Sequence, residues 1–208
     1  MRSNREHDAG EEGGKLAPDE EASAQRWSAL VDAANIESLL VYIAVRLGPA
    51  LRQRVEAVDV LQETLMAAWR DQAGAPLDDS RQFRVWLLAV VENRIRDMAD
   101  HAGAKKRGGH LAQEPLHPGA LAAGSTTPSR IAWHREAADV MRQALEQVPE
   151  DCRHVVFLRL FRQMTLREVA AELGLGLGTV RGLLRRGAEL YRQRLQAAVI
   201  GQTSLEAP

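Results

Sequence analysis

The segment from Thr165 to Arg186, TLREVAAELGLGLGTVRGLLRR, constrains this 208-residue chain most, because it predicts two short helices and the turn between them. Thr165 and Glu168 have the spacing of a capping box, which predicts the start of the first helix. Gly174 suits the left-handed turn that ends this helix. The residues predicted to pack across the turn are Val169, Ala170, Leu173, Val180, Leu183 and Leu184. The segment is therefore predicted to be a helix-turn-helix.

The outward face of the second helix carries one hydroxyl and three guanidinium groups, at Thr179, Arg181, Arg185 and Arg186. A protruding helix with such side chains suits the major groove of DNA. A plainer interpretation stays open, in which the two helices turn a corner in an all-helical core and the arginines form a solvated face. A phosphate-binding glycine loop is excluded, because the glycine spacing matches neither the dinucleotide fingerprint nor the Walker A pattern.

Charge is distributed unevenly along the chain, although the net value is only −1. Residues 1–25 hold seven acids against three Lys or Arg, a balance of −4. Residues 153–195 hold nine Arg against three Glu, a balance of +6. A local positive field attracts a polyanion whatever the total charge, so this distribution favours nucleic acid as a partner.

Composition favours an all-α fold and excludes several classes of protein. Only 4% of the residues are aromatic, the helix formers Ala, Leu, Arg and Glu dominate, and no strand pattern occurs. Cys152 is the only cysteine, so neither an internal disulfide nor a cysteine-rich zinc site is possible. Because the six histidines are scattered without metal-ligand spacing, we expect no metal, no cofactor and no enzyme activity.

The chain shows no sequence signal for a membrane or for secretion. Its longest apolar run, Val85–Val91, is far shorter than the roughly 20 residues of a membrane span. The polar, acidic N-terminus has no signal-peptide core. We therefore expect a cytoplasmic protein without membrane insertion.

The pattern along the chain predicts two small helical domains. Residues 1–25 have almost no large apolar side chains, which predicts a disordered acidic tail. Helical periodicity begins at Ile36, and the two domains are predicted at residues 26–101 and 130–198. Residues 102–129 are rich in Gly and Pro and predict a flexible linker, whose length lets the domains lie far apart as separately folded modules.

Helix boundaries follow from capping and breaking residues. In the first domain one helix is predicted to end at Gly48-Pro49, a second to begin at a capping box of Asp59 and Gln62, and a third to be capped by Ser80. In the second domain Pro128 suits the first turn of a helix. These helices carry the apolar stripes of the two predicted cores.

Two separate segments resemble one family, the extracytoplasmic-function (ECF) sigma factors of bacterial RNA polymerase. In the first domain, DVLQETLMAAWR at Asp59–Arg70 and FRVWLLAVVENRIRD at Phe83–Asp97 are similar to sigma region 2. In the second, VPEDCRHVVFLR at Val148–Arg159 and the helix-turn-helix with GTVR are similar to region 4. The resemblance implies a transcription initiation factor that directs core polymerase to promoters and opens them.

The resemblance also implies partners and the residues that bind them. Asp59, Gln62 and Glu63 match the face that docks on the clamp coiled coil of the polymerase β′ subunit, and the β subunit is a second implied contact. Their spacing places them on one helix face, although acids near a helix N-terminus can also simply complement the helix dipole. Promoter DNA and an anti-sigma factor complete the implied partners.

The third helix and the loop before it resemble the family's element for opening the promoter and reading the minus-ten sequence. Trapping a flipped base in a pocket can drive strand opening without bond chemistry. Asn93 matches a position near that pocket, and its amide can both donate to and accept from a base. The residues expected to hold phosphates are Arg84, Arg94, Arg96, Lys105, Lys106 and Arg107. For each of these cations a solvated surface position is the alternative.

In region 4 the second helix of the helix-turn-helix is expected to enter the major groove at the minus-thirty-five element. Arg181 and Arg186 match DNA-contacting positions of the family, and Arg185 is a further candidate. The chain departs from the family at Gly182-Leu183, where many members have Ser-Arg. Fewer polar side chains make fewer base-specific bonds, so we expect degenerate or shape-assisted recognition.

Two other functions are compatible with parts of the sequence. A sigma mimic would use the same two domains to sequester an anti-sigma factor, which the sparse polar side chains at the start of the recognition helix would permit. A helix-turn-helix repressor would read operators as a dimer, but this function leaves the first domain unexplained.

Overall fold

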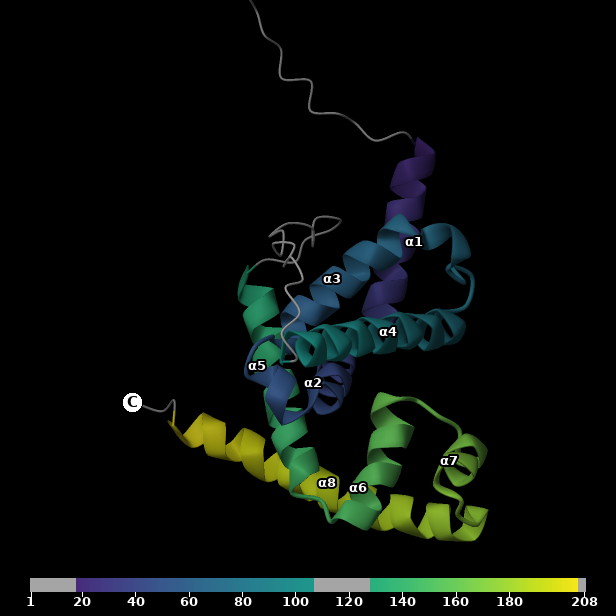
Figure 1. Cartoon of the computed structure of the whole chain (residues 1–208). Coiled ribbons are helices and arrows are strands. Elements are labelled where there is room, and N and C mark those ends of the chain that lie inside the picture. The colour runs from purple at the N-terminus through teal and green to yellow at the C-terminus, as the bar shows by residue number, and fades with distance from the viewer. Residues whose placement is uncertain (1–17, 107–127, 206–208) are drawn as a thin grey trace, which may run out of the picture.

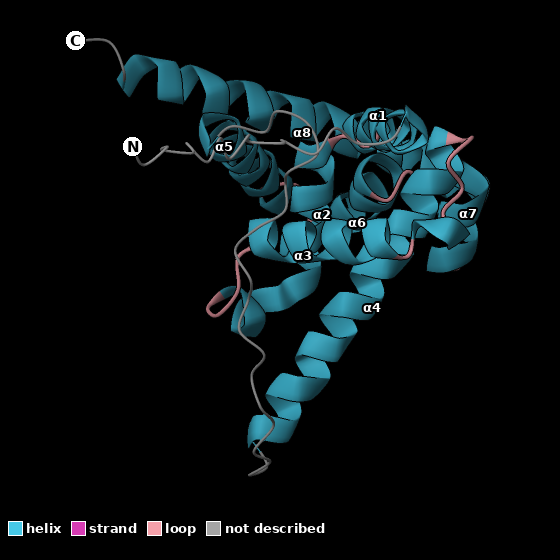
Figure 2. Ribbon diagram, turned by 90° about the horizontal axis from the view of Figure 1, so that it is seen from above, coloured by secondary structure: helices cyan, strands magenta, loops and turns pink. Residues whose placement is uncertain are grey.

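The computed structural model describes residues 18–106 and 128–205, and every regular element within these ranges is helical (Figures 1 and 2). The first range holds α1 (Pro18–Ala33), α2 (Ile36–Arg52), α3 (Ala57–Arg70), a 3₁₀ turn η1 (Gln72–Gly74) and α4 (Ser80–Lys106). The second holds α5 (Pro128–Glu146), α6 (Glu150–Val156), a π-helical turn η2 (Phe157–Phe161), α7 (Leu166–Leu173) and α8 (Leu177–Leu205). We call these ranges the N-terminal half and the C-terminal half. The predicted all-α fold class is confirmed.

The helix-turn-helix forms as the sequence predicts. Thr165 accepts a hydrogen bond from the amide of Glu168, whose side chain accepts one from the amide of Thr165 at 2.6 Å, so the capping box is confirmed. Gly174 ends α7 in the left-handed region, at φ 62° and ψ 28°. A small core of Val155, Leu158, Val169 and Val180 packs α6, η2, α7 and α8 together. This core fixes the angle at which α8 leaves the turn.

Three predicted helix boundaries differ in detail. Gly48, at φ 64° and ψ 171°, breaks the helical backbone of α2 as predicted, but a further helical stretch follows this kink and continues to Arg52. The capping box of Asp59 and Gln62 is wrong, because α3 already begins at Ala57 and Asp59 lies inside its first turn. At the start of α4 the cap is made by the side chain of Asp79, which accepts from the next amides, rather than by Ser80.

Parts of the predicted tail and of the predicted linker are helical. Helix α1 begins at Pro18, so residues 18–25 are helical and not disordered. Helix α4 runs to Lys106, five residues beyond the predicted end of the first domain. Residues 1–17 and 107–127, which hold the rest of both predictions, lie outside the described residues. Pro128 starts α5 as predicted.

The two halves share one hydrophobic core, so in this structure they pack against each other, although the length of the linker would also let them lie apart. Buried side chains of α1 to α4 and of α5, α6, η2 and α8 form a single cluster. Helix α2 lies at its centre and packs against α3, α4, α5 and η2. In Figure 1, α5 runs beside α2 and connects the α1–α4 bundle to α6 and α8 below it. The ring of Tyr42 stacks on that of Phe157 with centroids 5.6 Å apart.

No single helix among the described residues has both the length and the apolar character to cross a membrane. Helices α1 and α2 meet the criterion only when taken together, and they are bent by 65° at their junction. Several of their large apolar side chains, among them Trp27, Leu39 and Ile43, are buried in the core described above.

Candidate nucleic-acid and polymerase interface

The outward face of α8 near the turn presents the predicted recognition side chains. Val180 is fully buried against Val169 and anchors the helix, while Thr179, Arg181 and Arg185 are exposed. Neither Arg181 nor Arg185 forms a hydrogen bond or ion pair with any residue that the structure describes. Figure 1 shows α7 and the first turns of α8 at the lower right edge of the molecule. Two guanidinium groups are thus available to a ligand.

Arg186 is exposed but already engaged within the C-terminal half. Its guanidinium forms an ion pair with Asp151 of α6 and donates to the Sγ of Cys152 at 3.1 Å. The backbone amide of Cys152, with help from Arg186, holds the pKa of Asp151 below its ordinary value. Contact between Arg186 and DNA would therefore compete with this link between α8 and α6.

The predicted polymerase face lies on α3 and is partly covered. Asp59, Gln62 and Glu63 are all half-buried. Gln62 lines a small apolar cavity together with Ile131 and His134 of α5. The C-terminal half thus reaches the edge of this face.

The polymerase face is also tied to one of the predicted DNA-binding residues. Glu63 accepts hydrogen bonds from Arg94 of α4, with 3.0 Å between Nε and Oε2. The structure therefore joins two predicted sites that the sequence placed apart.

Arg84 corrects the predicted set of phosphate-binding residues. Its side chain is 2% exposed, and its guanidinium bonds to the carbonyl oxygens of Ala34 and Phe161 and to the hydroxyl of Ser38. A group enclosed in this way cannot reach a phosphate. The sequence held a signal for this burial, because Arg84 lies on the helical stripe of the buried residues Leu88 and Val91.

The other predicted residues of α4 lie in the second half of the helix. Asn93 and Arg96 are exposed and bonded to each other, with Oδ1 3.2 Å from Nη1. Lys105 and Lys106 form the last residues of α4, and Arg107 lies outside the described residues. Arg96 and Asn93 therefore remain available on the solvent side, whereas Arg84 does not.

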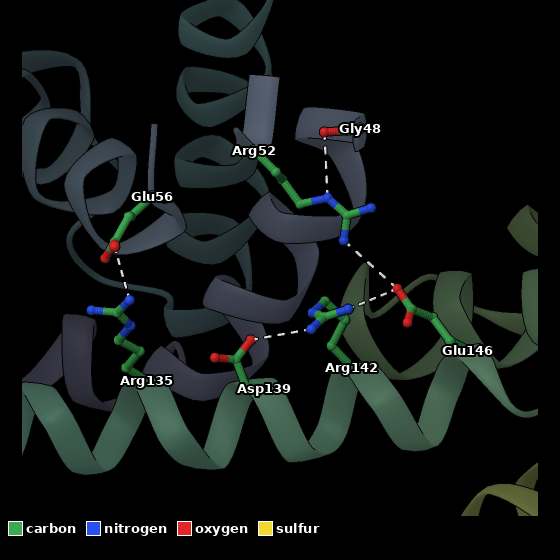
Figure 3. A network of polar contacts seen from close by, with 7 residues as sticks. All are labelled: Gly48, Arg52, Glu56, Arg135, Asp139, Arg142 and Glu146. Carbon is green, nitrogen blue, oxygen red and sulfur yellow. Dashed lines mark hydrogen bonds and ion pairs between the residues drawn. The ribbon is translucent and has the colours of Figure 1, made fainter. Parts of the chain in front are cut away.

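A polar network between α2, α3 and α5 was not predicted from the sequence (Figure 3). Arg135 of α5 pairs with Glu56 at 2.8 Å, and Arg52 of α2 lies 3.6 Å from Glu146. His134 of α5 contacts Glu37 of α2 at 2.8 Å. Salt-bridge partners so far apart in sequence leave no local pattern, so no motif could have identified them.

The described residues contain no group of three or more His, Cys, Asp or Glu that could hold a metal ion. The exposed cations on α8 and α4 are suited to bind a polyanion through charge and hydrogen bonds. Recognition of a negatively charged partner is therefore a chemistry that these cations support.

Two family models match the chain, in the order that the resemblance implies. The model for sigma-70 region 2 matches residues 35–104, and the model for sigma-70 region 4 matches residues 138–189. Together they cover more than half of the 208 residues. The first includes α2 to α4 and the second includes the helix-turn-helix.

Curated relatives of similar sequence are ECF sigma factors. The ECF RNA polymerase sigma factor SigL of Mycobacterium tuberculosis is 29% identical over 143 residues, which cover 68% of this chain and 75% of the relative. SigW of Bacillus subtilis is 25% identical and the sigma-E factor of Escherichia coli 24%, each over 147 residues. These two alignments cover 68% of this chain and 76% and 74% of the relatives.

A solved structure, described as a co-crystal of the sigma factor RpoE with the anti-sigma factor NepR from Bartonella quintana, is 22% identical with a TM-score of 0.35. The alignment covers 79% of this chain and 91% of that one. The two matched regions and the ECF relatives decide the family independently of this likeness. This chain belongs to the sigma-70 family as an ECF sigma factor, a transcription initiation factor of the family that binds RNA polymerase and promoter DNA.

Proposed function

We propose that this sigma factor docks on core polymerase through α3, opens promoters with α4 and reads the minus-thirty-five element with α8. The observation that carries the proposal is the pair of exposed guanidinium groups at Arg181 and Arg185, on a helix anchored by Val180. A rigid helix with open donors can bind base edges and phosphates in the major groove. Thr179 and Arg186 complete this face. Arg186 would reach DNA after its ion pair with Asp151 breaks.

The polymerase contact of the proposal is the face of α3. Asp59 and Glu63 are four residues apart and carry two carboxylates on one side of the helix. Carboxylates suit the arginines of a partner helix such as the clamp coiled coil of β′. The β subunit would contact the C-terminal half, and an anti-sigma factor would be the regulatory partner. These partners place the protein in the cytoplasm, where bacterial RNA polymerase acts.

The minus-ten contact is proposed for α4 and the loop that precedes it. Asn93 would pair with a flipped base, while Arg94 and Arg96 would hold the backbone of the opened strand, together with Lys105, Lys106 and Arg107. Arg94 would first release Glu63, which links strand opening to polymerase docking. In this division, polymerase and minus-ten binding belong to residues 26–101, and minus-thirty-five binding belongs to residues 130–198.

Sequence readout at the minus-thirty-five element should be degenerate. Gly178 and Gly182 are both exposed on α8 near Arg181 and add no side chain to the groove. A helix with few donors relies more on phosphate contacts and on DNA shape. Promoters of this factor should therefore vary more at minus thirty-five than at minus ten.

Run-off transcription with core polymerase and a library of genomic promoters tests the proposal. The wild-type chain should initiate transcription, and Arg181→Ala combined with Arg185→Ala should reduce initiation at least about 30-fold, because two good base contacts at about 1 to 3 kcal/mol each contribute about 2 kcal/mol or more. Arg192→Ala is the matched control, because Arg192 is exposed on the same helix but paired with Glu189. No initiation by the wild-type chain, with tight binding to an anti-sigma factor, would favour a sigma mimic instead.

A further inference from the structure

One buried arginine joins the two halves of the chain. The guanidinium of Arg84, from α4, donates to the hydroxyl of Ser38 at 2.9 Å and to the carbonyl of Phe161 at 2.7 Å, and it also bonds the carbonyl of Ala34. Ala34 and Ser38 belong to the N-terminal half, whereas Phe161 ends the π-helical turn of the C-terminal half. This side chain therefore bridges two segments whose sequence positions are 77 residues apart.

The charge of Arg84 has only neutral partners. No carboxylate of the described residues lies within ion-pair distance of it, and its Nε has no hydrogen-bond partner. Burial lowers the pKa of this guanidinium to about 10. A buried cation without a counter-ion depends on every acceptor that it has. Loss of the Phe161 carbonyl would therefore favour exposure of Arg84 to water.

The π-helical turn presents the Phe161 carbonyl to Arg84. Helix η2 ends at Phe161, and two residues later Gln163 has a positive φ of 55°, so the chain turns away from the helix axis. Carbonyl groups at a helix end lack partners within the helix and accept from side chains. In the same turn Phe157 stacks on Tyr42 of α2, with ring planes 2° apart. The turn thus contributes both a polar and an aromatic contact to the N-terminal half.

Closure of the two halves limits access to the polymerase face on α3. With η2 held by Arg84, α5 lies along α2, and His134 contacts Glu37 at 2.8 Å. Ile131 and His134 then border the cavity that Gln62 lines. A polymerase helix that approaches Gln62 would meet these α5 side chains.

We propose that Arg84 and the Phe161 carbonyl form a latch that holds the free sigma factor closed, and that core polymerase binds tightly only after this latch opens. The inference rests on the proposed function, because it concerns access to the α3 face. It assigns Arg84 to control of the conformation in place of contact with DNA.

Fluorescence energy transfer across the chain tests the latch without polymerase. Labels on cysteines introduced at the exposed residues Ala29 of α1 and Ala171 of α7 report the separation of the halves, while the native Cys152 is fully buried. Arg84→Ala should raise the ratio of open to closed chain about tenfold, the effect of removing a hydrogen bond to a charged group. Arg70→Ala, an exposed arginine of α3, is the control and should leave the ratio unchanged.

A second variant keeps this test informative if Arg84→Ala does not fold. Phe157→Ala removes the stacking on Tyr42 from a half-buried position and should also raise the open fraction. Energy transfer that is unchanged from wild type in a folded variant would overturn the latch.

A reducible cross-link tests whether closure blocks polymerase. Arg52→Cys with Glu146→Cys, joined by a disulfide-containing bismaleimide, bridges the two halves at a contact of 3.6 Å. The linked chain should bind core polymerase at least about tenfold more weakly, and reduction of the linker should restore binding. Arg142→Cys with Glu146→Cys is the matched control, because both residues lie on α5.

The outcomes separate the latch from the proposed function. Unchanged core binding by the bridged chain would overturn the inhibitory role of closure. Failure of the unlinked wild-type chain to bind core polymerase would instead overturn the proposed function, and the energy-transfer result would still decide whether Arg84 closes the chain.

Discussion

At the scale of single residues, the environment of each charged group decides what it does. Arg181 and Arg185 are open to solvent, Arg186 is shared between α6 and the surface, and Arg84 is enclosed. Glu92 is a further case, because its carboxylate accepts from Arg46 at 2.6 Å and from the hydroxyl of Tyr42. Desolvation raises the pKa of Glu92, but the bonds to Arg46 and Tyr42 outweigh it, and the net pKa is below the ordinary value.

Glu92→Gln should destabilise the chain at neutral pH by roughly 1 kcal/mol, because charged hydrogen bonds at a partly exposed site are lost. A carboxylate with a lowered folded pKa stabilises the fold above its unfolded pKa, and this contribution disappears as the pH falls through the folded pKa. Urea unfolding should therefore show that the free energy of unfolding differs less between wild type and Glu92→Gln near pH 3 than at pH 7. Glu136→Gln, an exposed control on α5, should behave as wild type at both values. An equal difference in the free energy of unfolding between wild type and Glu92→Gln at both pH values would contradict this account of Glu92.

At the scale of elements, α8 has two roles along its length: it carries the recognition side chains and it packs against α6. Its first turns carry the recognition side chains, and its middle crosses α6 at Gly187. A Cβ built at Gly187 would lie 2.7 Å from Cγ2 of Val156 and 2.9 Å from Cβ of Cys152. Only a residue without a side chain fits this crossing, so Gly187 sets the position of the recognition helix.

Gly187→Ala should destabilise the C-terminal half by about 1 to 3 kcal/mol, the cost of overpacking a close contact. Gly182→Ala is the matched control on the same helix, because a Cβ there meets no atom within 4 Å. This control should stabilise α8 by about 0.5 to 1 kcal/mol through its higher helix propensity. Urea denaturation followed by circular dichroism measures the free energy of unfolding of both variants. Equal effects of the two substitutions would rule out the close crossing.

At the scale of the whole molecule, the local pattern of the sequence predicted the helices and several of their ends, but not how the helices assemble. The capping box at Thr165, the turn at Gly174 and the start of α5 at Pro128 depend on neighbouring residues, and all three are confirmed. The packing of α2 against α5 and η2 depends on residues far apart in sequence. Tyr42 and Phe157 stack on each other, but no sequence motif around either residue predicts this contact. A linker rich in Gly and Pro permits the two halves to pack together as well as to lie apart.

The candidate site was likewise predictable where it depends on one helix and unpredictable where it depends on the packing of several. The exposed face of α8 follows from helix periodicity, because Val180 and Leu184 fix the buried side. The burial of Arg84 and the pairing of Glu63 with Arg94 depend on how α4 packs. Residue type favours a solvent position for arginine, and only the stripe of Leu88 and Val91 indicated otherwise.

Promoter opening is the most direct test of the central claim that this chain makes core polymerase start at promoters. Permanganate detects unpaired thymines in DNA, and a promoter found by run-off transcription supplies the template. The account predicts reactive thymines around the minus-ten element only when core polymerase and this chain are both present. Thymines that stay unreactive with both proteins, or that react equally with core polymerase alone, would contradict it.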